Sequence, residues 1–164
     1  MKQQELMVKM TLDGWNRLVS DTDNLLNSLT DEQLQAEIAP GRNRGIYLLG
    51  HLTAVHDRML PLLGFGEQKH PELNTPFLTS PDKAEKNLPS VSELRTYWKE
   101  ANDTLDKHFK SLQPEEWFQK HTSVSEEDFA KEPHRNRLNV VMGRSLHFAN
   151  HLGQMILLKS REQK

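Results

Sequence analysis

The chain has 164 residues with 21 Lys and Arg, 23 Asp and Glu and 8 His, which gives a formal net charge of −2 at pH 7. This length predicts one domain over residues 1–164, and the near balance of charge argues against a nucleic-acid or anionic-membrane partner. There is no cysteine, so disulfides, thiolate nucleophiles and cysteine–metal sites are excluded, and any metal must be held by His, Asp or Glu.

The N-terminal residues and the apolar runs bear on where the protein works. Residues 1–5 lack the apolar core of a signal peptide, and no apolar run approaches the ~18 residues that span a bilayer. We therefore expect a soluble protein of the cytoplasm that acts on a small molecule and has no membrane partner.

In the first part of the chain, apolar residues recur at helical spacing in two long segments. A first helix is predicted over residues 6–29, and residues 30–33 then have the form of a capping box that opens a short helical turn. The Pro-Gly pair at 40–41 is expected to end that turn. The second helix is predicted to start after Asn43 as its N-cap and to reach about residue 63.

The periodicity is lost over residues 64–89, where four prolines interrupt a polar stretch that predicts a long crossover. Ser90 and Glu93 form a second capping box, which opens a third helix to about residue 112. The rest of the chain is predicted to form a single helical turn at 114–117, an irregular stretch over 118–133 and a fourth helix over 137–159.

These elements predict an all-α fold, a four-helix bundle with a long crossover between the second and third helices. No segment shows the two-residue alternation of a strand. The tryptophans are expected in the core or at an interface. Arg42-Asn43-Arg44 precedes Gly50 with the spacing by which Arg135-Asn136-Arg137 precedes Gly143, so the second and fourth helices could be related by a pseudo-two-fold axis.

Two histidines near the C-terminus are the strongest sign of chemistry. His147 and His151 lie four residues apart in a helical run, so both imidazoles project from one face of the helix. Gln154 continues that face. The pair becomes a metal site only if a third ligand comes from another element.

His51 is the candidate third ligand, because it belongs to the apolar stripe of the second helix. A lone histidine on such a stripe is more often a hydrogen-bonded core residue, but three buried imidazoles without a metal would need three separate hydrogen-bonding solutions. His56 lies about 140° round the helix from His51 and is not expected to share a metal with it. The remaining histidines are expected to be ordinary solvated residues: His70, His108, His121 and His134.

At these motifs the chain resembles the DinB-like (DinB/YfiT) superfamily. The resemblance rests on Leu48-Leu49-Gly50-His51-Leu52 and on His147 followed by His151-Leu152-Gly153-Gln154, with the helix order and the crossover. It implies a four-helix bundle, often dimeric, in which zinc or nickel is bound by His51, His147 and His151. It also implies relatives that are isomerases and S-transferases using small thiols such as mycothiol or bacillithiol. Asn150 stands where many members have a further histidine.

Three histidines leave a coordination position open, and two enzyme chemistries are consistent with it. A metal there can lower the pKa of a bound water to about 7, as in a hydrolase, or bind and deprotonate a small thiol, as in a transferase. A thiol would have to come from outside this cysteine-free chain. The third alternative is a non-catalytic metal-binding bundle, closed by a fourth protein ligand such as His121 or His134.

Few other residues are candidates for a catalytic role. Gln154 could hydrogen-bond a ligand of the metal or orient His151, and Arg144 could bind a carboxylate of the substrate or form a salt bridge to another helix. Arginines cluster before the second and fourth helices and could form an anion-binding rim or interhelical ion pairs: Arg42, Arg44, Arg135 and Arg137. Asp57 is expected at the surface, so the sequence offers no convincing acid–base carboxylate.

Overall fold

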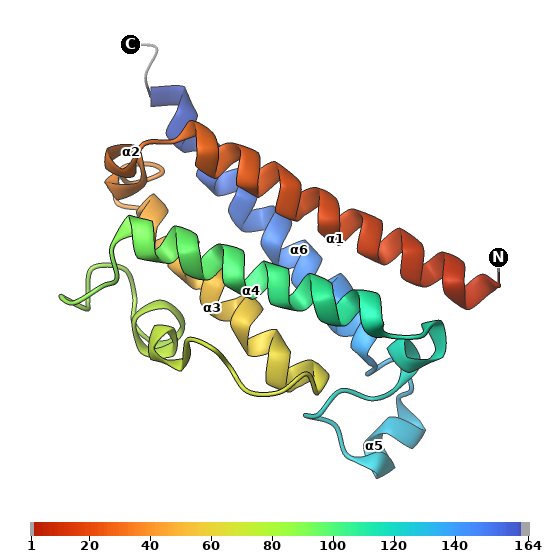
Figure 1. Ribbon diagram of the computed structural model, residues 1–164. Helices are drawn as coiled ribbons and strands as arrows, with labels where there is room; N and C mark the ends of the chain where they lie inside the picture. The colour runs from red at the N-terminus through yellow and green to blue at the C-terminus, as the bar shows by residue number, and fades with distance from the viewer. Residues whose placement is uncertain (1, 162–164) are drawn as a thin grey trace.

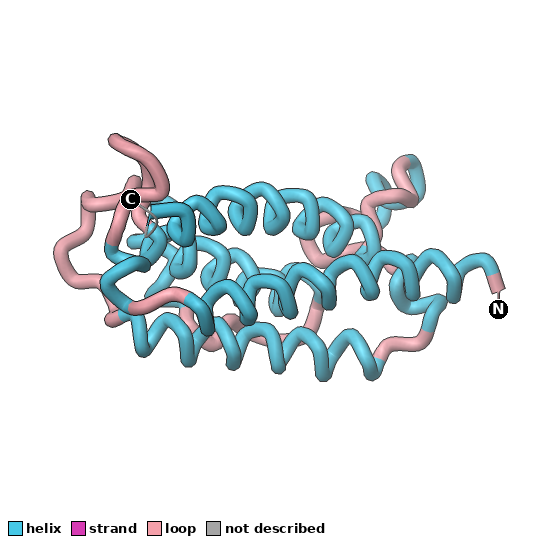
Figure 2. The backbone as a smooth tube through the Cα atoms, turned by 90° about the horizontal axis from the view of Figure 1, so that it is seen from above, coloured by secondary structure: helices cyan, strands magenta, loops and turns pink. Residues whose placement is uncertain are grey.

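The structure is a computed structural model and describes residues 2–161. Four long helices form the bundle: α1 (Gln3–Ser28), α3 (Gly45–Leu63), α4 (Val91–Ser111) and α6 (Arg137–Met155) (Figure 1). Shorter elements connect them: α2 (Asp31–Gln35), η1 (Pro71–Leu73), η2 (Thr75–Thr79), η3 (Pro114–Phe118), α5 (Glu126–Lys131) and η4 (Ile156–Arg161). Within residues 2–161 there is no strand, only two isolated β-bridges (Figure 2), so the all-α prediction is confirmed.

The directions of the long helices follow from the crossover. In Figure 1, α1 and α6 run toward the end of the bundle where α2 lies, while α3 and α4 run the opposite way. The long connection between α3 and α4 returns the chain to the α2 end, which allows these neighbouring helices to be parallel. The predicted bundle with a crossover between its second and third long helices is therefore confirmed.

The helix ends confirm the two predicted capping boxes but not the predicted N-cap of α3 or the predicted end of the last helix. Both capping boxes are formed, at Thr30 with Gln33 and at Ser90 with Glu93. The prediction of Asn43 as the N-cap of α3 was wrong, because Arg44 takes that position and makes no side-chain capping bond. The last helix is also shorter than predicted: α6 ends at Met155, and η4 continues the chain in 3-10 conformation.

The connection before α6 is more ordered than the sequence predicted. Residues 118–133 were expected to be irregular, but they include α5, whose N-cap Ser125 accepts a hydrogen bond from the Asp128 backbone N–H. A single β-bridge, Lys120 with Asn136, lies just before α6, as Glu37 with Arg44 lies just before α3. The two histidine-bearing helices thus begin in similar local structure, which agrees with the suggested pseudo-two-fold.

The crossover packs on α3 and α4 through specific contacts. Asp57 is fully buried and accepts hydrogen bonds from the backbone N–H groups of Lys69 and His70, both at 2.9 Å. The expectation of a surface Asp57 was therefore wrong: a buried carboxylate needs such partners, and the crossover supplies them. His70 is not an ordinary solvated residue either, because its ring stacks on Tyr97 at 3.9 Å.

Aromatic side chains fill the centre of the bundle. Trp15, Trp98 and Trp117 are each at most 2% exposed, which places all three in the core. Phe148 of α6 packs against Trp15 and Trp98 with ring centroids 5.6 and 5.5 Å apart. No helix within residues 2–161 is both long enough and apolar enough to cross a membrane.

Candidate metal centre

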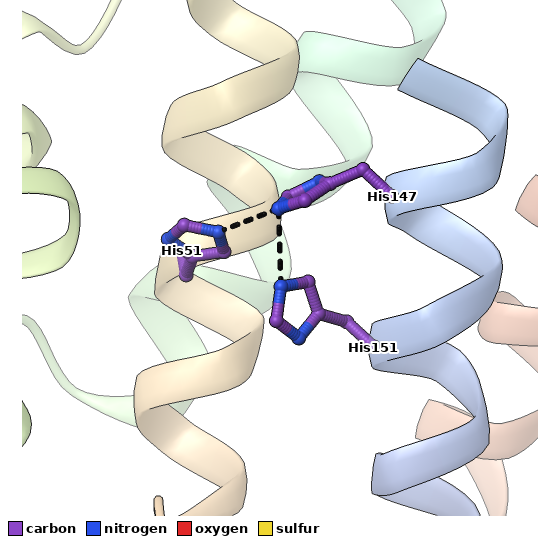
Figure 3. A group of neighbouring side chains, drawn as sticks. All are labelled: His51, His147 and His151. Atoms are coloured by element: carbon purple, nitrogen blue, oxygen red, sulfur yellow. Dashed lines mark hydrogen bonds between the residues drawn. The ribbon is translucent and has the colours of Figure 1, made fainter. Parts of the chain in front are cut away.

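The three predicted histidines converge between α3 and α6 (Figure 3). His51 Nε2 and His151 Nε2 each lie 3.1 Å from His147 Nε2, and ligand atoms of all three lie within 4.8 Å of one another. Each of the three residues is partly exposed. The helical phase of the residues, read from the sequence, brings them together as expected.

Two of the rings are oriented by hydrogen bonds on the side away from the cluster. His51 Nδ1 donates to the Phe77 carbonyl oxygen at 2.8 Å, and His151 Nδ1 donates to Gln154 Oε1 at 2.8 Å. Because a carbonyl or amide oxygen only accepts, these bonds place the hydrogens on Nδ1 and leave both Nε2 atoms as bare lone pairs. Outer partners of this kind fix ring orientation and tautomer at metal sites.

This arrangement fits a metal ion better than a network of hydrogen bonds alone. Both bare lone pairs point at His147 Nε2, and a single N–H there could satisfy only one of them. A cation can accept all three lone pairs at once. Among residues 2–161 no Asp or Glu joins the group, which leaves three nitrogen ligands and an open coordination position.

The surroundings keep His147 and His51 neutral. Burial lowers the pKa of His147 to about 4, with further lowering by the neighbouring His151, His51 and Arg144. Burial also lowers the pKa of His51, opposed by its hydrogen bond to the Phe77 carbonyl. Both rings therefore present unprotonated nitrogens at neutral pH, as metal binding requires.

Arg144 lies on α6, one turn before His147, and is partly buried. Its positive charge contributes to lowering the pKa of His51 and of His147, which places the guanidinium beside the cluster. Of the two roles predicted for it, the salt bridge to another helix is not formed with any residue described in 2–161.

Three of the four arginines of the predicted rim have side-chain contacts with the protein. Arg44 pairs with Asp82 at 2.7 Å, and the Asp82 side chain is only 5% exposed. Arg135 pairs with Glu132, and Arg137 donates to the Glu116 carbonyl oxygen. The partners of Arg44 and Arg135 lie in connecting segments and not in another long helix, so these two arginines do not form the predicted interhelical ion pairs.

The remaining histidines do not join the cluster. His56 is fully buried on another face of α3, as its helical phase predicted. His121 and His134 lie in the connection before α6, and neither belongs to the group of possible ligands found within residues 2–161. His108 stacks on Phe65 at 4.6 Å, so the expectation of an ordinary solvated ring was wrong for this residue also.

Sequence reasoning missed the role of the π-helical turn η2. The turn lies beside α3 because Gly50 has no side chain: a Cβ there would collide with the Phe77 ring. The same residue, Phe77, supplies the carbonyl that orients His51. Gly50 next to His51 was visible in the sequence, but its partner, 27 residues further along, was not.

We expect Gly50→Ala to displace Phe77, to destabilise the protein by about 1–3 kcal/mol through overpacking, and to weaken metal binding by disturbing His51. Gly143→Ala is the matched control, since Gly143 is the counterpart of Gly50 in α6 and nothing lies within 4 Å of an added Cβ. Urea unfolding and metal titration of both variants check this. Equal metal affinity in the two variants would contradict the assigned role of Phe77.

Fold and site together define a class: a helical bundle with three histidines from two helices placed to hold one divalent ion. The sequence matches the family model of the DinB superfamily over residues 15–155, and the chain belongs to this family. It is also similar to the crystal structure of a conserved protein from Enterococcus faecalis, with a TM-score of 0.60 and 15% identity over 98% of this chain and 99% of that one. At that identity the likeness shows the fold alone. A search of curated proteins finds no match.

Proposed function

We propose that the protein is a divalent-metal-dependent transferase that uses a low-molecular-weight thiol and binds zinc or nickel through His51, His147 and His151. The observation that carries the proposal is the convergence of three imidazole nitrogens at a partly exposed site. The bound ion would supply a Lewis-acidic position at which a thiol loses its proton, and zinc favours thiolate.

Two alternatives predicted from the sequence have less support. A hydrolase would act on water at the same position, but the group of possible ligands found within residues 2–161 contains no carboxylate that could bind the ion and also act as a base. A purely structural site is expected to be closed by a fourth protein ligand, and neither His121 nor His134 belongs to the group. The transferase therefore leads, with the hydrolase as the second candidate.

Gln154 and Arg144 are the two other residues with a role at this site. Gln154 holds the His151 ring through the bond to Nδ1 and so sets the direction of its Nε2. Arg144 binds a carboxylate of the thiol or of the substrate beside the metal position. A thiol reaction also favours the cytoplasm, where thiols are kept reduced.

The Arg144 assignment is tested on the cobalt-loaded protein, where a bound thiolate gives a charge-transfer absorption band. We expect 3-mercaptopropionate to bind about tenfold more tightly than the uncharged 2-mercaptoethanol, the effect of about 1.5 kcal/mol from a charged hydrogen bond. Arg144→Gln should remove this preference and leave 2-mercaptoethanol binding unchanged. If neither thiol gives the band with wild-type protein, the transferase proposal fails and the hydrolase takes its place.

A homodimer is the second part of the proposal. Large apolar side chains are exposed on two adjacent helices, with Met10 of α1 at 66% and Leu146 of α6 at 77%. Leu6 and Met7 of α1 and Met142 of α6 are also large, apolar and exposed. Exposed apolar surface of this kind is typical of protein–protein contacts.

Leu146→Glu is expected to convert the dimer to a monomer in analytical ultracentrifugation, because it replaces the most exposed of these apolar side chains with a charge. Lys107→Glu, an exposed change on α4, is the control and should leave the dimer intact. A wild-type protein that sediments as a monomer at every concentration would refute the homodimer.

A further inference from the structure

Two buried imidazole nitrogens on neighbouring elements have no hydrogen-bond partner among the described residues. They are His147 Nδ1 on α6 and His56 Nε2 on α3. Buried polar atoms are nearly always hydrogen-bonded to protein or to an ordered water, so each of these atoms requires an explanation. His56 is outside the metal group, and nothing in the proposed function uses it.

The hydrogen bonds of His56 determine which of its nitrogens carries the hydrogen. Asn102 Nδ2 donates to the Trp98 carbonyl oxygen at 2.8 Å, which fixes the side-chain amide and turns Oδ1 toward the histidine. His56 Nδ1 lies 2.9 Å from that oxygen and therefore donates to it. The unpartnered Nε2 is consequently an acceptor with a free lone pair.

His147 Nδ1, in contrast, is a hydrogen-bond donor that lacks an acceptor. Its Nε2 faces the other two imidazoles, so a metal bound there would leave the hydrogen on Nδ1, as a donor. A metal-bound histidine almost always donates this second N–H to an acceptor. His51 and His151 have theirs, in the Phe77 carbonyl and Gln154, whereas His147 has none among the described residues.

The two rings lie in adjoining parts of the core. His56 is fully buried and packs against Phe148, the residue after His147, with ring centroids 4.8 Å apart. The Trp15 and Trp98 rings also pack against the His56 ring, with centroids 4.7 and 5.0 Å away. Charge on His147 contributes to lowering the pKa of His56, which agrees with their proximity.

We propose that His56 is a positioning residue for the metal centre: its Nε2 accepts, through one buried water, the Nδ1–H of metal-bound His147. A water is required because no direct hydrogen bond joins the two nitrogens. The chain of contacts then runs from the metal ligand through His56 to Asn102 and the Trp98 carbonyl. The proposal rests on the proposed metal site, since His147 is a Nδ1–H donor only when its Nε2 binds the ion.

Two variants of His56 separate the functions of its nitrogens. His56→Asn keeps a donor near Nδ1 for Asn102 and loses the acceptor at Nε2, whereas His56→Gln keeps an acceptor near Nε2. In competition titrations with a chromophoric zinc chelator, we expect His56→Asn to bind zinc 10–100-fold more weakly, the range for losing an outer partner of a metal ligand, and His56→Gln to bind as the wild type does.

Nitrogen-15 NMR of zinc-loaded wild-type protein provides a test that does not depend on whether a variant folds. We expect neutral His56 with its hydrogen on Nδ1, and a slowly exchanging Nδ1–H on His147. A His56 hydrogen on Nε2, or equal zinc affinity of His56→Asn and wild type, would overturn this inference and leave the proposed metal site standing. Failure of the wild-type protein to bind zinc would overturn both.

Discussion

Replacing His147 with alanine is expected to lower divalent-metal affinity by more than the 10–100-fold that follows loss of an outer-shell partner. His147 Nε2 is the atom that lies 3.1 Å from both other Nε2 atoms, so its removal takes away the centre of the cluster. Metal titration followed by elemental analysis of the dialysed protein measures the effect.

The loss in His147→Ala must be separated from unfolding. His147 is only partly buried, and no protein group among the described residues bonds its Nδ1, so the variant should keep its helical circular dichroism and a cooperative unfolding transition. His134→Ala changes an exposed histidine of the connection before α6 and should retain full metal binding. Stoichiometric metal in purified His147→Ala would refute the assignment.

The metal-free protein is expected to lose stability as the pH falls below about 6.5. The buried His56 contributes to this loss. Burial lowers the pKa of His56 to about 3, opposed by the bond to Asn102 and aided by charge on His147, Arg144 and His51. An unfolded histidine has a pKa of about 6.5. Between these values the unfolded chain binds a proton that the folded protein does not, so the free energy of unfolding decreases as the pH decreases.

His56→Asn should reduce this pH dependence. One proton bound only by the unfolded state changes the free energy of unfolding by up to about 1.4 kcal/mol per pH unit. The slope between pH 6 and pH 4, from urea unfolding of metal-free protein, should therefore be smaller in the variant by up to that amount. His134→Ala again serves as the control, since it removes an exposed histidine of the connection before α6. Identical slopes in wild type and His56→Asn would show that His56 titrates normally.

Features governed by local periodicity could be predicted from the sequence. The 3.6-residue repeat fixed the inward direction of His51, His147 and His151 and separated His56 from them, because phase along one helix needs no knowledge of the other helices. The two capping boxes were likewise determined within four residues. The family resemblance supported the same histidines independently of this argument.

Features that depend on distant partners could not be predicted in this way. Arg44 replaces Asn43 as the cap of α3, and its side chain pairs with Asp82, 38 residues away. Asp57 looked like a surface residue because the N–H groups that satisfy it belong to the crossover, 12 and 13 residues later. The Phe77 carbonyl and Asn102, which orient His51 and His56, also come from segments with no recognisable relation to α3 in the sequence.

The most direct test of the account is elemental analysis of untagged protein purified without chelators, beside the His51→Ala/His147→Ala/His151→Ala triple variant and the His134→Ala control. We expect one transition-metal ion per chain in wild type and control, and none in the triple variant. Equal metal in all three proteins, or none in wild type after reconstitution with zinc, nickel or manganese, would contradict it.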